Sequence, residues 1–157
     1  MEFRDLKRQY RKNRRQIDRA IKSTLKDGVF IGGNPVYELE TKLADYIGVK
    51  HCITCANGTD ALTLVLMAWG IKSGDAVFVP DFTFFATAEA PAFLGATPVF
   101  VDVNKDTFNM SVDSLETAIK NVLSEGQLQP KVIIPVDLFG LPADYKKITS
   151  VAKKYGL

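Results

Sequence analysis

Short apolar segments alternate with segments of helical periodicity along most of this chain. The apolar segments, which we predict to be strands, are residues 51–56, 76–79, 98–102 and 131–136. The helical segments that follow them are residues 58–69, 85–94, 112–122 and 142–155. Strands that alternate with helices require crossover connections, which produce a parallel sheet covered by helices on both faces. The sequence therefore predicts an α/β fold, a three-layer sandwich around a mainly parallel sheet.

Two further helices are predicted before this alternation begins. The first runs from about Asp5 to Lys26 and ends at Gly28. The second begins at Asn34, a favoured N-cap residue, and carries Pro35 in its first turn.

The first helix is strongly basic, although the net charge of the chain is only +2. Half of the 20 Lys and Arg residues lie there: Arg4, Lys7, Arg8, Arg11, Lys12, Arg14, Arg15, Arg19, Lys22 and Lys26. A nucleic-acid-binding helix is one interpretation, and a solvated helix face is the other. Apolar residues recur on the same helix at helical spacing: Leu6, Tyr10, Ile17, Ile21 and Leu25. We therefore favour a helix whose apolar side docks on a core, and we expect no nucleic-acid partner.

The composition, 46% hydrophobic and 24% charged residues, is that of a soluble globular protein. No apolar run is long enough to span a bilayer, and the N-terminus is charged, so we expect a cytoplasmic protein with no membrane partner.

Cys52 and Cys55 lie three apart in a predicted strand and face opposite sides of it, and His51 is the one histidine. This pattern predicts buried structural thiols and no metal site.

A candidate anion site lies where the first predicted strand of the α/β region meets its helix. Asn57, Gly58 and Thr59 form the turn, and Gly58 allows a ligand to approach the backbone closely. Free N–H groups and the dipole at a helix start favour a phosphate. An ordinary strand-to-helix turn without a ligand is the alternative. The chain lacks the glycine motifs typical of dinucleotide- and ATP-binding proteins.

Aromatic residues follow the next predicted strand. Phe82, Phe84 and Phe85 come directly after it, at the edge where a parallel sheet binds its ligands. A flat heterocycle beside the phosphate could stack on one of these rings. We expect Phe82 and Phe85 to belong to the core and Phe84 to be the stacking residue.

Several motifs, in order along the chain, carry a resemblance to a known family. They are Asn57-Gly58-Thr59-Asp60-Ala61-Leu62, Gly74-Asp75, Pro80-x-x-Thr83-Phe84-x-Ala86-Thr87, Gly95-Ala96-x-Pro98-Val99-Phe100-x-Asp102 and Pro135-Val136-x-Leu138-x-Gly140. The chain resembles the DegT/StrS-type aminotransferases, pyridoxal-phosphate (PLP) enzymes that act on nucleotide-linked keto sugars. The segments Phe3–Lys7 and Cys52–Asp60 look most like the members that act on UDP-linked 3-keto-uronic acids.

The resemblance implies the large domain of the aspartate-aminotransferase fold (fold type I), incomplete in this chain. Residues 1–34 would form a basic helix and a glycine loop, and residues 35–157 the first part of the PLP-binding domain. Asn57, Gly58 and Thr59 would hold the cofactor phosphate, and Phe84 would lie against its ring.

The resemblance also implies substrates and a partner. Ile31, Gly32 and Gly33 would help to close over the sugar. A nucleotide-linked keto sugar and glutamate would be the substrates of the full-length enzyme, and a homodimer would be the assembly.

One feature of the family is absent from this sequence. The family's Schiff-base lysine and the acid that holds the pyridinium proton fall after the last residue of this chain, and Lys153 and Lys154 lie on the predicted solvent face of the final helix. We therefore expect no catalytic residue here and an inactive fragment. The alternative is a non-catalytic binding module of the same fold that associates with a partner chain, and the missing strands of the sheet would leave an edge for such a contact.

Overall fold

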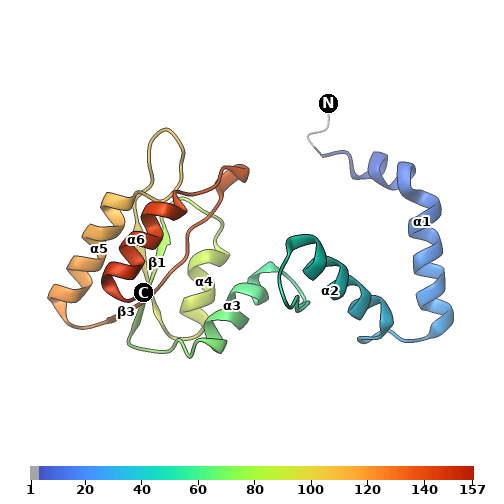
Figure 1. Ribbon diagram of the computed structural model, residues 1–157, viewed down its shortest axis with the longest axis horizontal. Helices are drawn as coiled ribbons and strands as arrows, with labels where there is room; N and C mark the ends of the chain where they lie inside the picture. Colours follow the sequence, from blue (N-terminus) through green and yellow to red (C-terminus); the bar gives the residue numbers. More distant parts are fainter. Residues whose placement is uncertain (1–3) are drawn as a thin grey trace. The chain divides into compact units, whose positions relative to one another are not determined.

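The computed structural model describes residues 4–157, so Phe3 of the opening motif lies outside the described residues. The chain separates into two compact units, Met1–Thr54 and Cys55–Leu157. Helices α1 and α2 belong to the first unit, and α3 to α6 with the strands belong to the second (Figure 1). The division into domains at residue 34 stays a prediction.

The first unit begins with α1 (Leu6–Asp27), one residue from the predicted bounds. Asp5 caps it, because its side chain accepts a hydrogen bond from the Arg8 N–H at 2.8 Å. Gly28 ends it in the left-handed conformation, as predicted. None of the residues of α1 is buried. Its apolar residues, from Leu6 at 68% to Ile17 at 36% exposure, are uncovered, so the structure does not show the predicted docking.

The second helix of this unit, α2, covers Asn34–Ile47, and its N-cap is Gly33 rather than the predicted Asn34. Gly33 has φ 91°, and a Cβ there would lie 2.9 Å from Cγ1 of Val29, so the turn requires glycine. Asn34 is the first residue of the helix, and its side chain does not cap the helix. Its Nδ2 donates to Oε1 of Glu38 at 2.6 Å, one turn along the helix.

The second unit contains a parallel sheet of three strands in the order β2-β1-β3. They are β1 (Asp75–Pro80), β2 (Thr97–Val101) and β3 (Gln129–Ile133). The central strand β1 pairs with both neighbours, and all six of its residues are buried. This burial explains why β1 reads as a continuous apolar run instead of an alternating one.

Helices cover both faces of the sheet. On one face, Val77 and Val79 of β1 pack with α3 (Gly58–Ala68) and α4 (Ala86–Phe93). On the other face, Ala76 and Phe78 pack with α5 (Val112–Glu125) and α6 (Tyr145–Tyr155). The predicted three-layer α/β sandwich with a parallel sheet is confirmed (Figure 1).

The predicted strand at residues 51–56 is wrong for the described structure. This segment is irregular, Ile53 is 83% exposed, and Cys55 is exposed instead of buried. A strand needs a neighbour to pair with its backbone groups, and this segment pairs with none of the three strands of the described sheet. Thr54 bonds instead to a side chain: its N–H and its hydroxyl both donate to Oε1 of Glu40 at 2.8 Å.

A cluster of polar side chains joins α5 to α6. Oε1 of Glu116 accepts hydrogen bonds from Nζ of Lys154 at 2.7 Å and from the hydroxyl of Tyr155 at 2.9 Å. Lys120 adds an ion pair at 3.1 Å. Hydrogen bonds from Lys154, Tyr155 and Lys120 lower the pKa of the Glu116 carboxyl to about 2.

The contribution of Glu116 to stability should depend on pH. Because its pKa is lower in the folded chain than the ordinary 4.5, the stabilisation is complete above about pH 4.5 and is lost as the pH falls towards 2. We expect E116Q to have a lower free energy of unfolding at pH 7 and a smaller loss of stability in acid than wild type. Urea unfolding at a series of pH values measures both. E125Q, at the exposed end of α5, is the control; an unchanged acid dependence in E116Q would refute the assignment.

Candidate functional site

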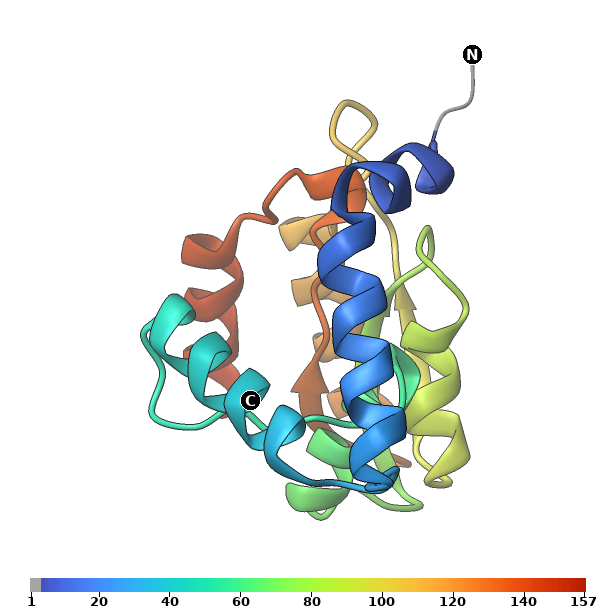
Figure 2. The ribbon, with the colours of Figure 1, turned by 90° about the vertical axis from the view of Figure 1, so that its right-hand side faces the viewer.

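The loops that follow the strands gather at one end of the sheet (Figures 1 and 2). Because the strands are parallel, the 81–85 turn after β1, the 102–109 loop after β2 and the 134–142 segment after β3 all leave the same edge. Helix α3 precedes β1 and packs on α4 and on the face of β1 that carries Val77 and Val79. This carboxyl edge is where open α/β sheets bind ligands.

The start of α3 leaves two backbone N–H groups without a partner among residues 4–157. Asn57 is the N-cap: its Oδ1 accepts from the Asp60 N–H at 2.9 Å, and its carbonyl accepts from the Ala61 N–H at 3.1 Å. The N–H groups of Gly58 and Thr59 have no such bond within these residues. Gly58 is exposed, and a Cβ built on it would meet nothing within 4 Å. These two amides can therefore receive an anion.

The 81–85 turn presents its aromatic side chains outward. Phe84 is 77% exposed, as a stacking residue requires. The expectation that Phe82 and Phe85 belong to the core is wrong, because they are 49% and 72% exposed. The turn extends beyond the sheet, and Phe82 packs instead on the ring of Phe108, 5.4 Å between centroids. Thr87, buried at the start of α4, holds the turn through a 3.0 Å bond between its hydroxyl and that of Thr83.

The three residues predicted to lie near the sugar belong to the first unit. Ile31, Gly32 and Gly33 form the loop between α1 and α2, where Ile31 is 95% exposed. Gly32 and Gly33 both have positive φ. Their role towards a substrate stays a prediction.

One buried polar residue at the carboxyl edge was missed by the sequence analysis. Asn109, 5% exposed, lies in the 102–109 loop and bonds to the segment after β3. The available signal was a single polar side chain between Phe108 and Met110, which did not distinguish it from an ordinary loop residue.

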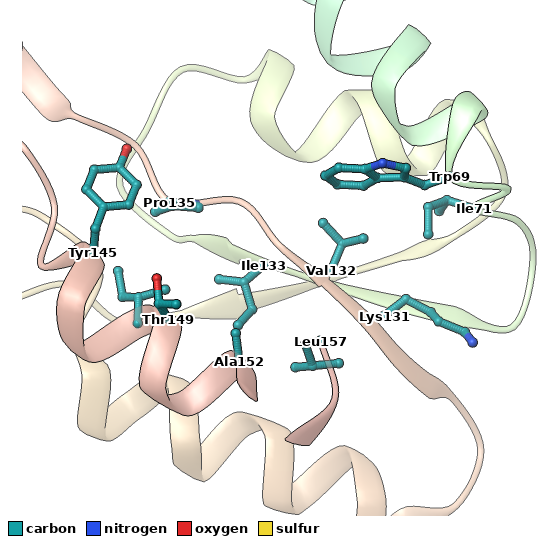
Figure 3. A pocket seen from close by; sticks show the side chains of 11 residues that line it. Trp69, Ile71, Lys131, Val132, Ile133, Pro135, Tyr145, Thr149, Ala152 and Leu157 are labelled. Atoms are coloured by element: carbon teal, nitrogen blue, oxygen red, sulfur yellow. The ribbon is translucent and has the colours of Figure 1, made fainter. Parts of the chain in front are cut away.

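A groove of about 500 Å³ lies beside strand β3 (Figure 3). Trp69 and Ile71, just after α3, lie on one side of β3, and α6 lies on the other. The lining is mainly apolar, and β3 is an edge strand of the described sheet. Trp69 follows the C-terminal end of α3, about 16 Å along the helix from Gly58, so the groove is not part of the candidate anion site.

The residues present fit part of a PLP site. The amides of Gly58 and Thr59 suit a phosphate, and the exposed ring of Phe84 suits the face of a pyridine. Lys153 and Lys154 are exposed on α6, where Nζ of Lys154 bonds to Glu116. The last helix therefore does not direct these lysines to the carboxyl edge.

The arrangement of a parallel sheet with helices on both faces is that of the large domain of fold type I PLP aminotransferases, of which this chain covers part. The sequence profile described as the DegT/DnrJ/EryC1/StrS aminotransferase family matches residues 11–157, and the chain belongs to that family. No helix among residues 4–157 is both long and apolar enough to cross a membrane.

Three comparisons show the extent of the likeness. The chain is 47% identical to the UDP-2-acetamido-2-deoxy-3-oxo-D-glucuronate aminotransferase of Pseudomonas aeruginosa over 157 residues, which are 42% of that protein. A DegT DnrJ EryC1 StrS aminotransferase from Brucella abortus matches the whole chain with TM-score 0.97 and 53% identity, over 42% of its own length. NtdA from Bacillus subtilis, solved with bound cofactor PMP, matches with TM-score 0.85 and 32% identity over 93% of this chain and 32% of its own. The chain thus spans less than half the length of these relatives.

The cap of α3 should be needed for an ordered anion site. Replacing Asn57 by Ala removes the acceptor for the Asp60 N–H, which should lower the free energy of unfolding by about 1 kcal/mol and expose that amide to solvent. Hydrogen exchange at Asp60 and urea unfolding measure the two effects. N57S keeps a capping oxygen and should stay close to wild type. Equal exchange at Asp60 in N57A and wild type would contradict the capping role.

Proposed function

We propose that this chain is the N-terminal part of a PLP-dependent aminotransferase that transfers an amino group from glutamate to a keto carbon of a nucleotide-linked sugar. The family assignment supports the reaction class. The name of the Pseudomonas relative supports a UDP-linked 3-keto sugar acid as the acceptor, in agreement with the resemblance of the Cys52–Asp60 segment.

The proposal is carried by the amides of Gly58 and Thr59 at the start of α3, which have no partner among residues 4–157, together with the exposed ring of Phe84 in the turn after β1. A phosphate bound by these amides and the helix dipole would anchor the cofactor at the carboxyl edge. Phe84 would then cover one face of the cofactor ring and exclude water from it.

Each candidate site residue would have a binding role in this proposal. Gly58 and Thr59 orient the phosphate, and Asn57 keeps their amides directed outward by capping the helix. Ile31, Gly32 and Gly33 would contact the sugar. The bound cofactor would supply the electron-withdrawing ring on which the amino transfer depends.

Four further parts of the proposal rest on the family resemblance. They are glutamate as the amino donor, a homodimer as the assembly, a cytoplasmic location, and the absence of transamination by these 157 residues alone. The position of Lys154, which is bonded to Glu116 on α6, supports the last of these. Incubation with PLP, glutamate and a UDP-linked keto sugar, followed by assay for 2-oxoglutarate, would overturn it if the product formed.

The N–H of Gly58 should contribute directly to phosphate binding. Gly58 is the first residue of α3, where proline is tolerated, and Asn57 before it is extended, with φ −164° and ψ 175°, as a residue before proline prefers. G58P therefore removes the donor without breaking the helix. Because a hydrogen bond to a charged group contributes about 1.5–3 kcal/mol, we expect the affinity for pyridoxamine 5′-phosphate to fall about tenfold or more.

The matched control is G58A, which keeps the N–H and has room for its Cβ. Isothermal titration calorimetry with pyridoxamine 5′-phosphate, and circular dichroism to verify the helix, distinguish the two variants. Equal affinities of G58P and G58A would mean that this amide does not bind the phosphate.

The groove beside β3 favours a second candidate function, a binding module that associates with a partner chain. An uncovered edge strand flanked by apolar side chains, with Trp69 66% exposed, is a surface on which another extended segment can pair. A PLP-binding part of an aminotransferase and such a module differ in what they need: the first needs the anion site, and the second needs the groove.

Association through the groove should be disrupted by a charge within it. Ala152 lines the groove on α6, so we expect A152D to remove any concentration-dependent association of the wild-type chain. Sedimentation velocity over a range of protein concentrations measures this. A92D, on the exposed surface of α4, is the control. A wild-type chain that stays monomeric throughout would count against this second function.

A further inference from the structure

We propose that Asn109 is a positioning residue that fixes two of the loops around the ligand site at the carboxyl edge, the 81–85 turn and the 137–142 segment. The inference rests on the proposed function, because it concerns how the ring of Phe84 is placed for a cofactor. It adds a residue that lies outside the anion site itself.

Asn109 contacts the segment after β3 directly. Nδ2 of Asn109 donates to the carbonyl of Leu141 at 2.9 Å and to that of Pro142 at 3.2 Å. Its Oδ1 accepts from the N–H of Leu138 at 3.3 Å. One buried amide therefore holds both ends of the short 3-10 helix η1 (Leu138–Gly140), about thirty residues further along the chain.

The segment that Asn109 holds is strained and carries an exposed aromatic ring. Phe139, within η1, has φ 55°, a conformation that is unfavourable for a bulky side chain, and it is 88% exposed. Strain of this kind persists only where surrounding contacts fix the backbone, and it concentrates at ligand sites. The three hydrogen bonds of Asn109 supply such contacts, together with Asp137, whose Oδ1 accepts from the Ala143 N–H at 2.9 Å.

Asn109 is also connected to the turn that carries Phe84, through the neighbouring residue Phe108. The preceding residue, Phe108, also has positive φ, 57°, and its N–H donates to the carbonyl of Asn104 at 2.8 Å. This backbone directs the ring of Phe108 onto that of Phe82, with 5.4 Å between centroids and 45° between planes. Phe82 and Phe84 belong to the same turn, so a shift of Asn109 displaces the turn through the aromatic pair.

Burial makes this arrangement sensitive to substitution. Asn109 is 5% exposed, and its side chain satisfies one N–H and two carbonyl groups of the segment that it holds. Truncation to Ala would remove three hydrogen bonds that hold the segment, and its partner groups lie on half-buried or exposed residues that water can reach. The segment would then move to regain bonds with water, and the neighbouring turn would lose its fixed position.

The test compares a ligand that contains the ring with one that does not. The probes are pyridoxamine 5′-phosphate and inorganic phosphate, titrated by calorimetry into wild type, N109A and the matched control N121A, in which an exposed Asn on α5 is replaced. If Asn109 positions Phe84, N109A should bind pyridoxamine 5′-phosphate about fivefold more weakly, since a displaced ring loses its stacking contact, and should bind inorganic phosphate as wild type does. Hydrogen exchange should show faster exchange of the Leu138 N–H in N109A alone.

The outcomes distinguish a positioning role of Asn109 from the absence of the anion site and from a general loss of stability. Equal weakening of both ligands in N109A, in proportion to the unfolded fraction, would show a merely structural residue and overturn the proposal. Unchanged affinity of N109A for pyridoxamine 5′-phosphate would overturn it and leave the proposed function intact. A wild-type chain that binds neither ligand would refute the anion site, and the positioning role with it.

Discussion

The burial of β1 on both faces is the constraint on which the rest of the second unit depends. Val77 and Val79 point to one helical layer, and Ala76 and Phe78 point to the other. Pairing with β2 and β3 on either side fixes the register of the sheet, and the parallel direction brings the three following loops to one edge. The candidate site therefore exists because an apolar strand is enclosed by two layers of helices, and its polar groups lie where the apolar run ends.

The buried polar side chains of this unit hold turns in place through hydrogen bonds. Asp75 accepts from the Lys72 N–H before β1, Thr87 bonds to Thr83 after it, and Asn109 holds the segment after β3. Among the described residues, no buried side-chain nitrogen or oxygen atom lacks a hydrogen-bond partner. The amides of Gly58 and Thr59 at the start of α3, by contrast, have no partner among residues 4–157, and Gly58 is exposed. This contrast separates groups that stabilise the fold from groups that are available to a ligand.

Sequence reasoning succeeded where the signal is local. Glycines determine where helices end, so α1 and its end at Gly28 could be predicted from neighbouring residues. It failed at residues 51–56, because a strand depends on partners that an apolar run does not specify. It also failed for Phe82 and Phe85, because hydrophobicity alone does not distinguish a core ring from one that a turn presents to solvent. Asn109 was missed because its partners lie about thirty residues away in the sequence.

Three exposed aromatic residues of the second unit, Phe84, Phe139 and Trp69, differ in their surroundings. Phe84 and Phe139 stand on turns that buried polar groups fix, so their exposure is defined by the backbone. Trp69 follows α3 and lies beside the edge strand β3, where its ring lines an apolar groove. A ring presented by a turn offers a flat face on which a planar ligand can stack, whereas a groove beside an unpaired strand offers a longer apolar surface and free backbone groups. On this physical ground, the carboxyl edge suits a small planar ligand, and the groove suits an extended chain that covers apolar surface.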